Sequence, residues 1–227
     1  MRTLSQHSEG AAQEAATYHP EMLSEIAAFS VAALVITLTP GADMALVARR
    51  ALGDGFGTAA RTSLGVCSGL IVHATASAVG VSAILARSAT AFTVLKVCGA
   101  VYLVLLGLTS FRRARKIRRE PEEVRALPPT RRVYVQGLLN NVLNPKPAIF
   151  YLAFLPQFIG PGDPVLLMAV ILVSIHIAMG VVWLLTWAWL VSRARAQFLR
   201  PRWRATLERV TGSVLVGLGV RLAAATR

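Results

Sequence analysis

Two stretches of this sequence place ionisable and polar side chains beside prolines in otherwise apolar surroundings. They read TLTPGADMAL at residues 37–46 and NNVLNPKPAIF at residues 140–150. The residues that could do chemistry are Pro40, Gly41 and Asp43 in the first stretch, and Asn141, Asn144, Pro145 and Lys146 in the second. A carboxylate and an ammonium can hold the opposite charges of a zwitterion, and a carboxylate can also exchange protons. The two stretches therefore suggest a site for binding or transport.

Each proline predicts a break in a helix. Pro40 lacks a backbone donor and disfavours helix at the residue before it, so carbonyls near Ile36 lose their partners. A new half-helix then begins near Ala42, another begins after Pro145, and each directs the positive end of its dipole at its break. Two interpretations stay open. The paired breaks flank a shared cavity, or each proline only kinks its helix and Asp43 caps the new N-terminus.

Two histidines, His73 and His176, lie in other apolar segments. Each could relay protons, or it could simply hydrogen bond a neighbouring helix. The asparagines of the second stretch have the same ambiguity, because an amide can coordinate a substrate or satisfy the broken backbone.

The composition favours a membrane protein. Hydrophobic residues make up 55% of the 227 and charged residues 15%, against roughly a quarter charged in soluble domains. The formal net charge of +13 comes from clusters between apolar blocks. Basic loops beside membrane lipid explain these clusters better than nucleic-acid binding, because aromatic residues are not interleaved with them.

We expect neither a metal nor a cofactor. Cys67 and Cys98 both fall within apolar blocks and indicate no disulfide framework or metal-ligand set. The sequence GDGFG at residues 53–57 superficially matches a dinucleotide fingerprint. It follows a predicted membrane helix and not a strand, so nucleotide binding is not expected.

Six segments are predicted to cross the membrane, which requires about 20 residues in a helix. Three qualify without interruption, two qualify only if they continue through a proline break, and the last has a short apolar core. In chain order they cover residues 26–48, 64–86, 91–111, 133–159, 165–191 and 207–225. The predicted fold is an all-α integral membrane protein with six transmembrane helices, the first and fourth broken at proline.

The spacing of the motifs predicts an internal repeat. Pro40 and Pro145 lie 105 residues apart, and His73 and His176 lie 103 apart. An odd number of spans in each half would give two inverted three-helix repeats, as in many secondary transporters. The division that follows is a disordered polar tail at 1–21, a first repeat at 22–111, a basic cytoplasmic loop at 112–132 and a second repeat at 133–227. Met1 and Met22 both remain candidates for the true start.

The basic residues predict an orientation. The loops after the first, third and fifth spans carry 18 lysines and arginines, and the opposite side with both termini carries five. The positive-inside bias places the richer side in the cytoplasm. Both termini are therefore expected outside it.

The motifs together carry a family resemblance. The segments TPGADMALVARRALGDGFGTAARTSLGVCSGLIVH, KVCGAVYLVLLG and NNVLNPKPAIFYLAFLPQFI follow one another between Leu23 and Val220. In combination they resemble the LysE/RhtB family of amino-acid exporters. The resemblance implies efflux of amino acids or close derivatives across a bacterial inner membrane, driven by an ion gradient and without ATP. Asp43 departs from the Asn of many members, so coupling through this position would not be general to the family.

The sequence thus predicts a secondary transporter, and no enzyme, that exports an amino acid or similar zwitterion by proton antiport. Asp43 and Lys146 are expected to face each other across the repeat interface. The substrate would replace their mutual contact, with its ammonium at Asp43 and its carboxylate at Lys146. Two alternatives stay open: an exporter of another solute such as a metal cation, and an intramembrane enzyme that uses Asp43 and a histidine. The solute, the coupling ion and a homo-oligomeric state are also left open.

Overall fold

The computed structural model describes residues 22–85, 89–119, 125–159, 165–193 and 200–224. Every regular element in these ranges is helical. In chain order they are an N-terminal helix, Met22–Leu38, then α2 (Ala42–Leu85), α3 (Ala89–Arg119), α4 (Val133–Val142), α5 (Pro145–Phe154), the 3-10 helix η1 (Leu155–Phe158), α6 (Val165–Arg193) and α8 (Pro201–Ala224). The predicted all-α class is confirmed for this part of the chain. The predicted tail at 1–21 lies outside the described residues.

Two of these helices contain stretches that could each cross a membrane by length and hydropathy, Val97–Arg119 and Leu166–Arg193. The N-terminal helix and Ala42–Ala78 pass the same test together, bent by 49° at the break between them. The described residues therefore hold two to three candidate spans, fewer than the six predicted. One physical reason is that α4 and α5, of 10 residues each, extend only about 15 Å apiece at a rise of 1.5 Å per residue.

The first break lies where Pro40 predicts it. The N-terminal helix ends at Leu38, and α2 begins at Ala42. Thr39 closes the last turn, because its backbone N–H and its hydroxyl both donate to the Val35 carbonyl, at 3.1 and 2.7 Å.

A second change of direction follows within α2. Gly55 has φ 78° and ψ −177°, a conformation that is essentially restricted to glycine. It separates the half-helix that begins at Ala42 from the long helix that continues to Leu85. Of the glycines of GDGFG, Gly55 thus forms the kink between two helical segments, and Gly53 and Gly57 lie in the helical turns beside it.

The other break, in the fourth predicted span, begins with a cap. Asn144 is extended, with φ −82° and ψ 118°, and its side chain accepts a hydrogen bond from the Lys146 backbone N–H at 3.0 Å. Pro145 follows at the first helical position of α5, where its missing N–H costs nothing. The predicted interruption of 133–159 is confirmed.

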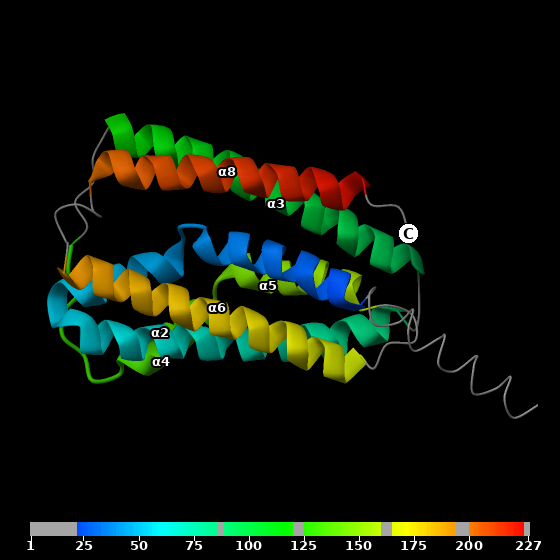
Figure 1. Ribbon diagram of the computed structural model, residues 1–227, viewed down its shortest axis with the longest axis horizontal. Helices are drawn as coiled ribbons and strands as arrows, with labels where there is room; N and C mark the ends of the chain where they lie inside the picture. Colours follow the sequence, from blue (N-terminus) through cyan, green and yellow to red (C-terminus); the bar gives the residue numbers. More distant parts are fainter. Residues whose placement is uncertain (1–21, 86–88, 120–124, 160–164, 194–199, 225–227) are drawn as a thin grey trace, which may run out of the picture.

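The helices form two layers in Figure 1. One holds α3 and α8, which pack along each other, and the other holds the remaining helices, with α2 against α4 and α6. The end of α3, the end of α6 and the start of α8 lie at one end of the molecule, and the end of α8 lies at the other. Most basic residues predicted for one side of the membrane therefore share one end of the fold.

Glycines allow α2 and α4 to touch through their backbones. A Cβ at Gly65 would lie 2.1 Å from the Tyr134 carbonyl oxygen, and a Cβ at Gly137 would lie 2.2 Å from that of Thr62. No side chain fits at such distances. These glycines hold the start of α4, and the asparagines near its end, close against α2.

The contact between α3 and α8 is reciprocal. A Cβ at Gly107 would lie 2.7 Å from the Gly212 carbonyl oxygen, and a Cβ at Gly212 would lie 2.8 Å from that of Gly107. Small residues recur every seven positions on both helices, at Ala100, Gly107 and Ala114 on α3 and at Ala205, Gly212 and Gly219 on α8. Each residue of one series lies 105 positions from its counterpart, the separation of Pro40 and Pro145.

A buried arginine fastens the basic end. Arg50, only 3% exposed, donates to the Gln136 side-chain oxygen at 3.0 and 2.7 Å. It also pairs with Asp54 at 3.0 Å and donates to the Pro128 carbonyl at 2.6 Å. The half-helix after the first break is thereby tied to α4 and to the segment that precedes it.

Candidate functional site

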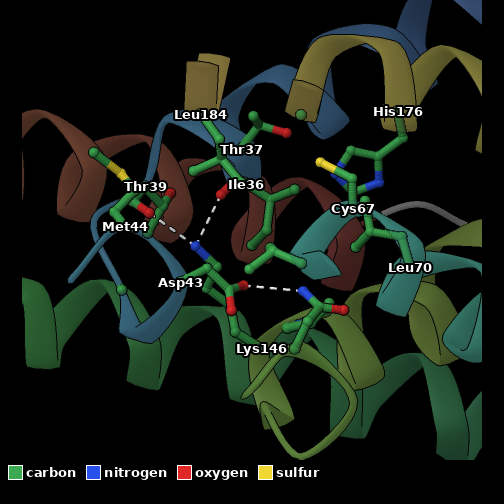
Figure 2. Close-up of a pocket in the computed structure, with 15 residues that line it drawn as sticks. Ile36, Thr37, Thr39, Asp43, Met44, Cys67, Leu70, Lys146, His176 and Leu184 are labelled. Carbon is green, nitrogen blue, oxygen red and sulfur yellow. Dashed lines mark hydrogen bonds between the residues drawn. The ribbon is translucent and has the colours of Figure 1, made fainter. Parts of the chain in front are cut away.

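The two breaks meet at a small cavity of about 50 Å³ between the N-terminal helix, α2, α4, α5 and α6. Figure 2 shows the side chains that line it. Five of the nine residues predicted from the sequence are among them: Gly41, Asp43, Asn141, Lys146 and His176. The structure thus brings the two proline stretches, 105 residues apart, to one place.

Lys146 reaches from the second break to the first. Its ammonium donates to the carbonyl oxygens of Ile36 and Thr39, at 2.9 and 2.8 Å (Figure 2). These carbonyls end the N-terminal helix, where the helix dipole is negative. The cation therefore satisfies backbone groups that Pro40 leaves without helical donors. A Cβ at Gly41 would lie 3.4 Å from the ammonium nitrogen, an ordinary van der Waals contact, so the chain passes directly beside the cation.

Asp43 reaches in the opposite direction. Its Oδ1 accepts from the Asn140 amide at 2.7 Å, and its Oδ2 accepts from the Asn141 and Asn144 amides at 3.0 and 3.2 Å. The carboxylate is also in the first turn of α2, where a negative charge is favourable. Three neutral donors from the second break thus hold the anion of the first.

The two breaks are therefore cross-tied, in the sense that a side chain from each break hydrogen bonds to groups of the other. Asp43 and Lys146 line one cavity, but each takes its hydrogen bonds from other groups. The direct contact that the sequence suggested is not formed in the described residues, where Lys146 binds carbonyls and Asp43 binds asparagines. The reason is geometric, since each charge lies nearest to the polar groups freed or supplied by the opposite break.

Two residues that line the cavity each have a buried polar atom without a hydrogen-bond partner. Asn141 is 1% exposed, and its Oδ1 is unpaired, as is the buried hydroxyl oxygen of Thr37. Both residues line the cavity. Buried polar atoms usually find partners, so a lining with two vacant ones favours a polar ligand.

The histidines have different positions. His176 lines the cavity and shares a hydrogen bond of 3.0 Å with the Tyr151 hydroxyl through Nδ1. His73 lies one shell further out, where its Nε2 donates to the Asn141 backbone carbonyl at 2.9 Å. That carbonyl belongs to the last turn of α4 and also accepts from the Asn144 backbone N–H at 2.9 Å, so His73 is a second donor at the second break.

The remaining predicted residues support the cavity from outside. Asn144 touches it through its hydrogen bond to Asp43. Pro145 begins α5, and Pro40 lines a separate, larger cavity on the other side of the first break.

Some functional groups were absent from the predicted set. Asn140 was not among the nine residues, although the sequence raised it together with Asn141 and Asn144 as a possible ligand. The carbonyl acceptors of Ile36 and Thr39 carry no side-chain signal, and the only indication of them is Pro40 itself. Thr37 could not be distinguished from other threonines that bond their own helix.

Comparison with known proteins identifies the family of the chain. The sequence model of the LysE type translocator family matches residues 34–226, which include both breaks and the residues that line the cavity. The chain belongs to the LysE type translocator family. The predicted resemblance to LysE/RhtB exporters is thereby confirmed.

Several relatives resemble this LysE family translocator along most of its length. An uncharacterized membrane protein, YrhP, of Bacillus subtilis is 30% identical over 88% of this chain and 98% of its own. A homoserine/homoserine lactone efflux protein of Salmonella typhi is 29% identical over 87% of this chain and 95% of its own. A threonine efflux protein of Escherichia coli K12 is 29% identical over 56% of this chain and 63% of its own. No solved structure matches the chain.

Proposed function

We propose that this LysE family translocator exports an amino acid or a related small zwitterion across the bacterial inner membrane, as a secondary transporter driven by proton antiport. One observation carries the proposal: a carboxylate and an ammonium, one from each break, line a cavity that also has unpaired polar atoms. The relatives named for homoserine and threonine efflux support an amino acid as the solute. An ammonium in the cavity wall argues against a metal cation.

The substrate would use the two charges separately. Its ammonium would lie at Asp43 and the vacant Asn141 Oδ1, and its carboxylate at Lys146. The cavity is far below the roughly 300–1,000 Å³ of ordinary ligand pockets. The half-helices must therefore move apart to admit a substrate, and the structure resembles a closed state.

Protons and substrate would compete for Asp43. As a carboxylate it accepts from three asparagine amides. A protonated Asp43 is itself a donor and has less capacity to accept, so it would lose part of this cradle and its attraction for an ammonium. A proton arriving from outside would then release the substrate outward.

The proposed architecture has six spans as two inverted repeats with both termini outside the cytoplasm. The reciprocal contact of Gly107 and Gly212 supports it, since a residue meets its own counterpart only at a two-fold axis. The basic excess at the end of α3, the end of α6 and the start of α8 supports the orientation.

The test is efflux of radiolabelled L-homoserine and L-threonine from loaded cells at imposed pH gradients. The wild-type chain should export at least one of them faster with an inward proton gradient. Asp43→Asn keeps the size but cannot titrate, so weak exchange should persist and gradient-driven efflux should disappear.

Asp54→Asn is the matched control, since Asp54 is on the same half-helix but pairs with Arg50 outside the cavity. It should retain the pH dependence at equal membrane abundance by immunoblot. Gradient-driven efflux at the wild-type rate in Asp43→Asn would remove Asp43 from the coupling step. If neither amino acid is exported by the wild type, the proposed substrate class is wrong for these solutes.

A further inference from the structure

A second cavity, of about 360 Å³, lies on the other side of the first break. One wall is the start of α2, from Ala42 to Ala48, with Pro40 and Gly41 before it. The opposite wall comes from α3 and α8. Its volume falls within the range of ordinary ligand pockets, so it can hold an amino acid without the widening that the smaller cavity requires.

Glu208 on α8 gives this cavity an anionic group. The residue is 6% exposed and lines the cavity, and its Oε2 has no hydrogen-bond partner. A buried carboxylate oxygen without a donor is costly unless a partner arrives. Its counterpart in the α3 series, 105 positions earlier, is the apolar Leu103. Ser110 on α3 forms a side-chain hydrogen bond with Glu208. Packing of α3 on α8 therefore engages part of the carboxylate, and Oε2 is the oxygen that stays without a donor.

Two arginines line the same cavity, Arg113 on α3 and Arg204 on α8. Both act electrostatically on the Glu208 carboxylate. A guanidinium is suited to a carboxylate ligand, because it donates in a planar fork and stays charged. One acid and two guanidinium groups around an open space therefore match a zwitterion that carries one ammonium and one carboxylate.

The two cavities share a partition. Gly41 and Met44 line both, and the Trp187 indole N–H fixes this segment by donating to the Met44 carbonyl at 3.0 Å. Arg113 lies in the part of α3 that leads to the basic end of the molecule. A solute that arrives from that end reaches the larger cavity first.

We propose that the larger cavity is a loading site for zwitterionic amino acids. Glu208 holds the ammonium and Arg113 and Arg204 hold the carboxylate, before the solute passes Gly41 and Met44 to the cavity between the breaks. The proposal rests on the proposed export function and adds a second binding site on the side of the basic loops.

The experiment measures protection of one cysteine in inside-out vesicles. Ile117 lines the cavity beside Arg113, so Ile117→Cys is introduced in full-length protein from which Cys67 and Cys98 have been replaced by alanine. A positively charged methanethiosulfonate reagent modifies it. L-homoserine should slow modification at least threefold. L-homoserine lactone, which lacks the carboxylate, should protect much less.

Substitutions separate the two sites. Glu208→Gln should raise the half-protecting concentration of L-homoserine about tenfold, as expected for a lost charge-assisted hydrogen bond, and Glu208→Asp should restore part of it. Arg202→Gln is the control, an exposed arginine on α8 outside the cavity lining. Asp43→Asn should keep protection while it loses gradient-driven efflux.

Each result decides. Absence of protection by L-homoserine, L-threonine, L-alanine and L-lysine, or protection unchanged in Glu208→Gln, overturns the loading site even where export is normal. Protection in a chain that exports none of them leaves the loading site standing and overturns the export function instead.

Discussion

Asn141 joins three parts of the candidate site through one residue. Its amide nitrogen donates to Asp43, its backbone carbonyl accepts from His73, and its Oδ1 is vacant in the cavity wall. Its position depends on Gly69 of α2, since a Cβ there would lie 2.5 Å from Oδ1 and 2.8 Å from the Asn141 Cβ. The absence of a side chain on α2 thus sets the place of a polar group on α4.

Gly69→Ala should therefore displace Asn141 and impair export. Overpacking of this kind costs about 1–3 kcal/mol, and we expect a lower Tm together with a several-fold loss of L-homoserine or L-threonine efflux. The Tm is measured on purified protein, and efflux is measured on loaded cells. Gly217→Ala on α8 is the matched control, because nothing lies within 4 Å of a Cβ there. Equal efflux in the two variants would show that the Asn141 position is irrelevant.

At the scale of elements, the backbone groups at the two helix breaks find their hydrogen-bond partners by different means. The first ends with Thr39 and a lysine from the other half, and the second begins with an asparagine cap. Asn144 serves twice, because its Oδ1 accepts from the Lys146 N–H and its Nδ2 donates to Asp43. The cap, and not only the proline after it, keeps the second break open.

Asn144→Ala should accordingly lower stability and efflux more than Pro145→Ala does. Loss of a cap costs about 1 kcal/mol and loss of a hydrogen bond to a charged group about 1.5–3 kcal/mol. Pro145→Ala keeps both contacts. We expect Asn144→Ala to lower the Tm by several degrees and to reduce efflux, and Pro145→Ala to retain most of each. The opposite order would assign the break to the proline.

The positions of the breaks were predictable, because Pro40 and Pro145 act through local covalent geometry. The partners across the breaks were not. Whether Lys146 meets Asp43 or the carbonyls of Ile36 and Thr39 depends on how two half-helices cross, and that crossing is set by backbone contacts such as Gly65 with Tyr134. A role for Glu208 could not be predicted from the sequence for a related reason, since its surroundings form only when α8 packs on α3.

For the whole molecule, the property to test is its orientation, that is, which end of the fold faces which side of the membrane. Arg118 and Arg202, both exposed, lie near the end where α3 finishes and α8 starts, and Ala223 lies at the far end of α8. Cysteines at Arg118 and Arg202 should react with an impermeant maleimide only in inside-out vesicles, in protein without Cys67 and Cys98. A cysteine at Ala223 should react only in right-side-out cells. Reaction of Arg118→Cys and Ala223→Cys from the same face would exclude the proposed orientation.

The cross-tied breaks also carry an asymmetry. In the register that pairs Gly107 with Gly212, the counterpart of Asp43 is Ala148 and the counterpart of Lys146 is Gly41. Each charged residue therefore has a small neutral counterpart. If the chain is the inverted repeat proposed above, its centre has a fixed electrical polarity. A zwitterion placed there has one favourable alignment and not two equivalent ones. Its side chain would then always point to the same wall, so a single set of apolar residues, and not an average over both halves, would decide which amino acids fit.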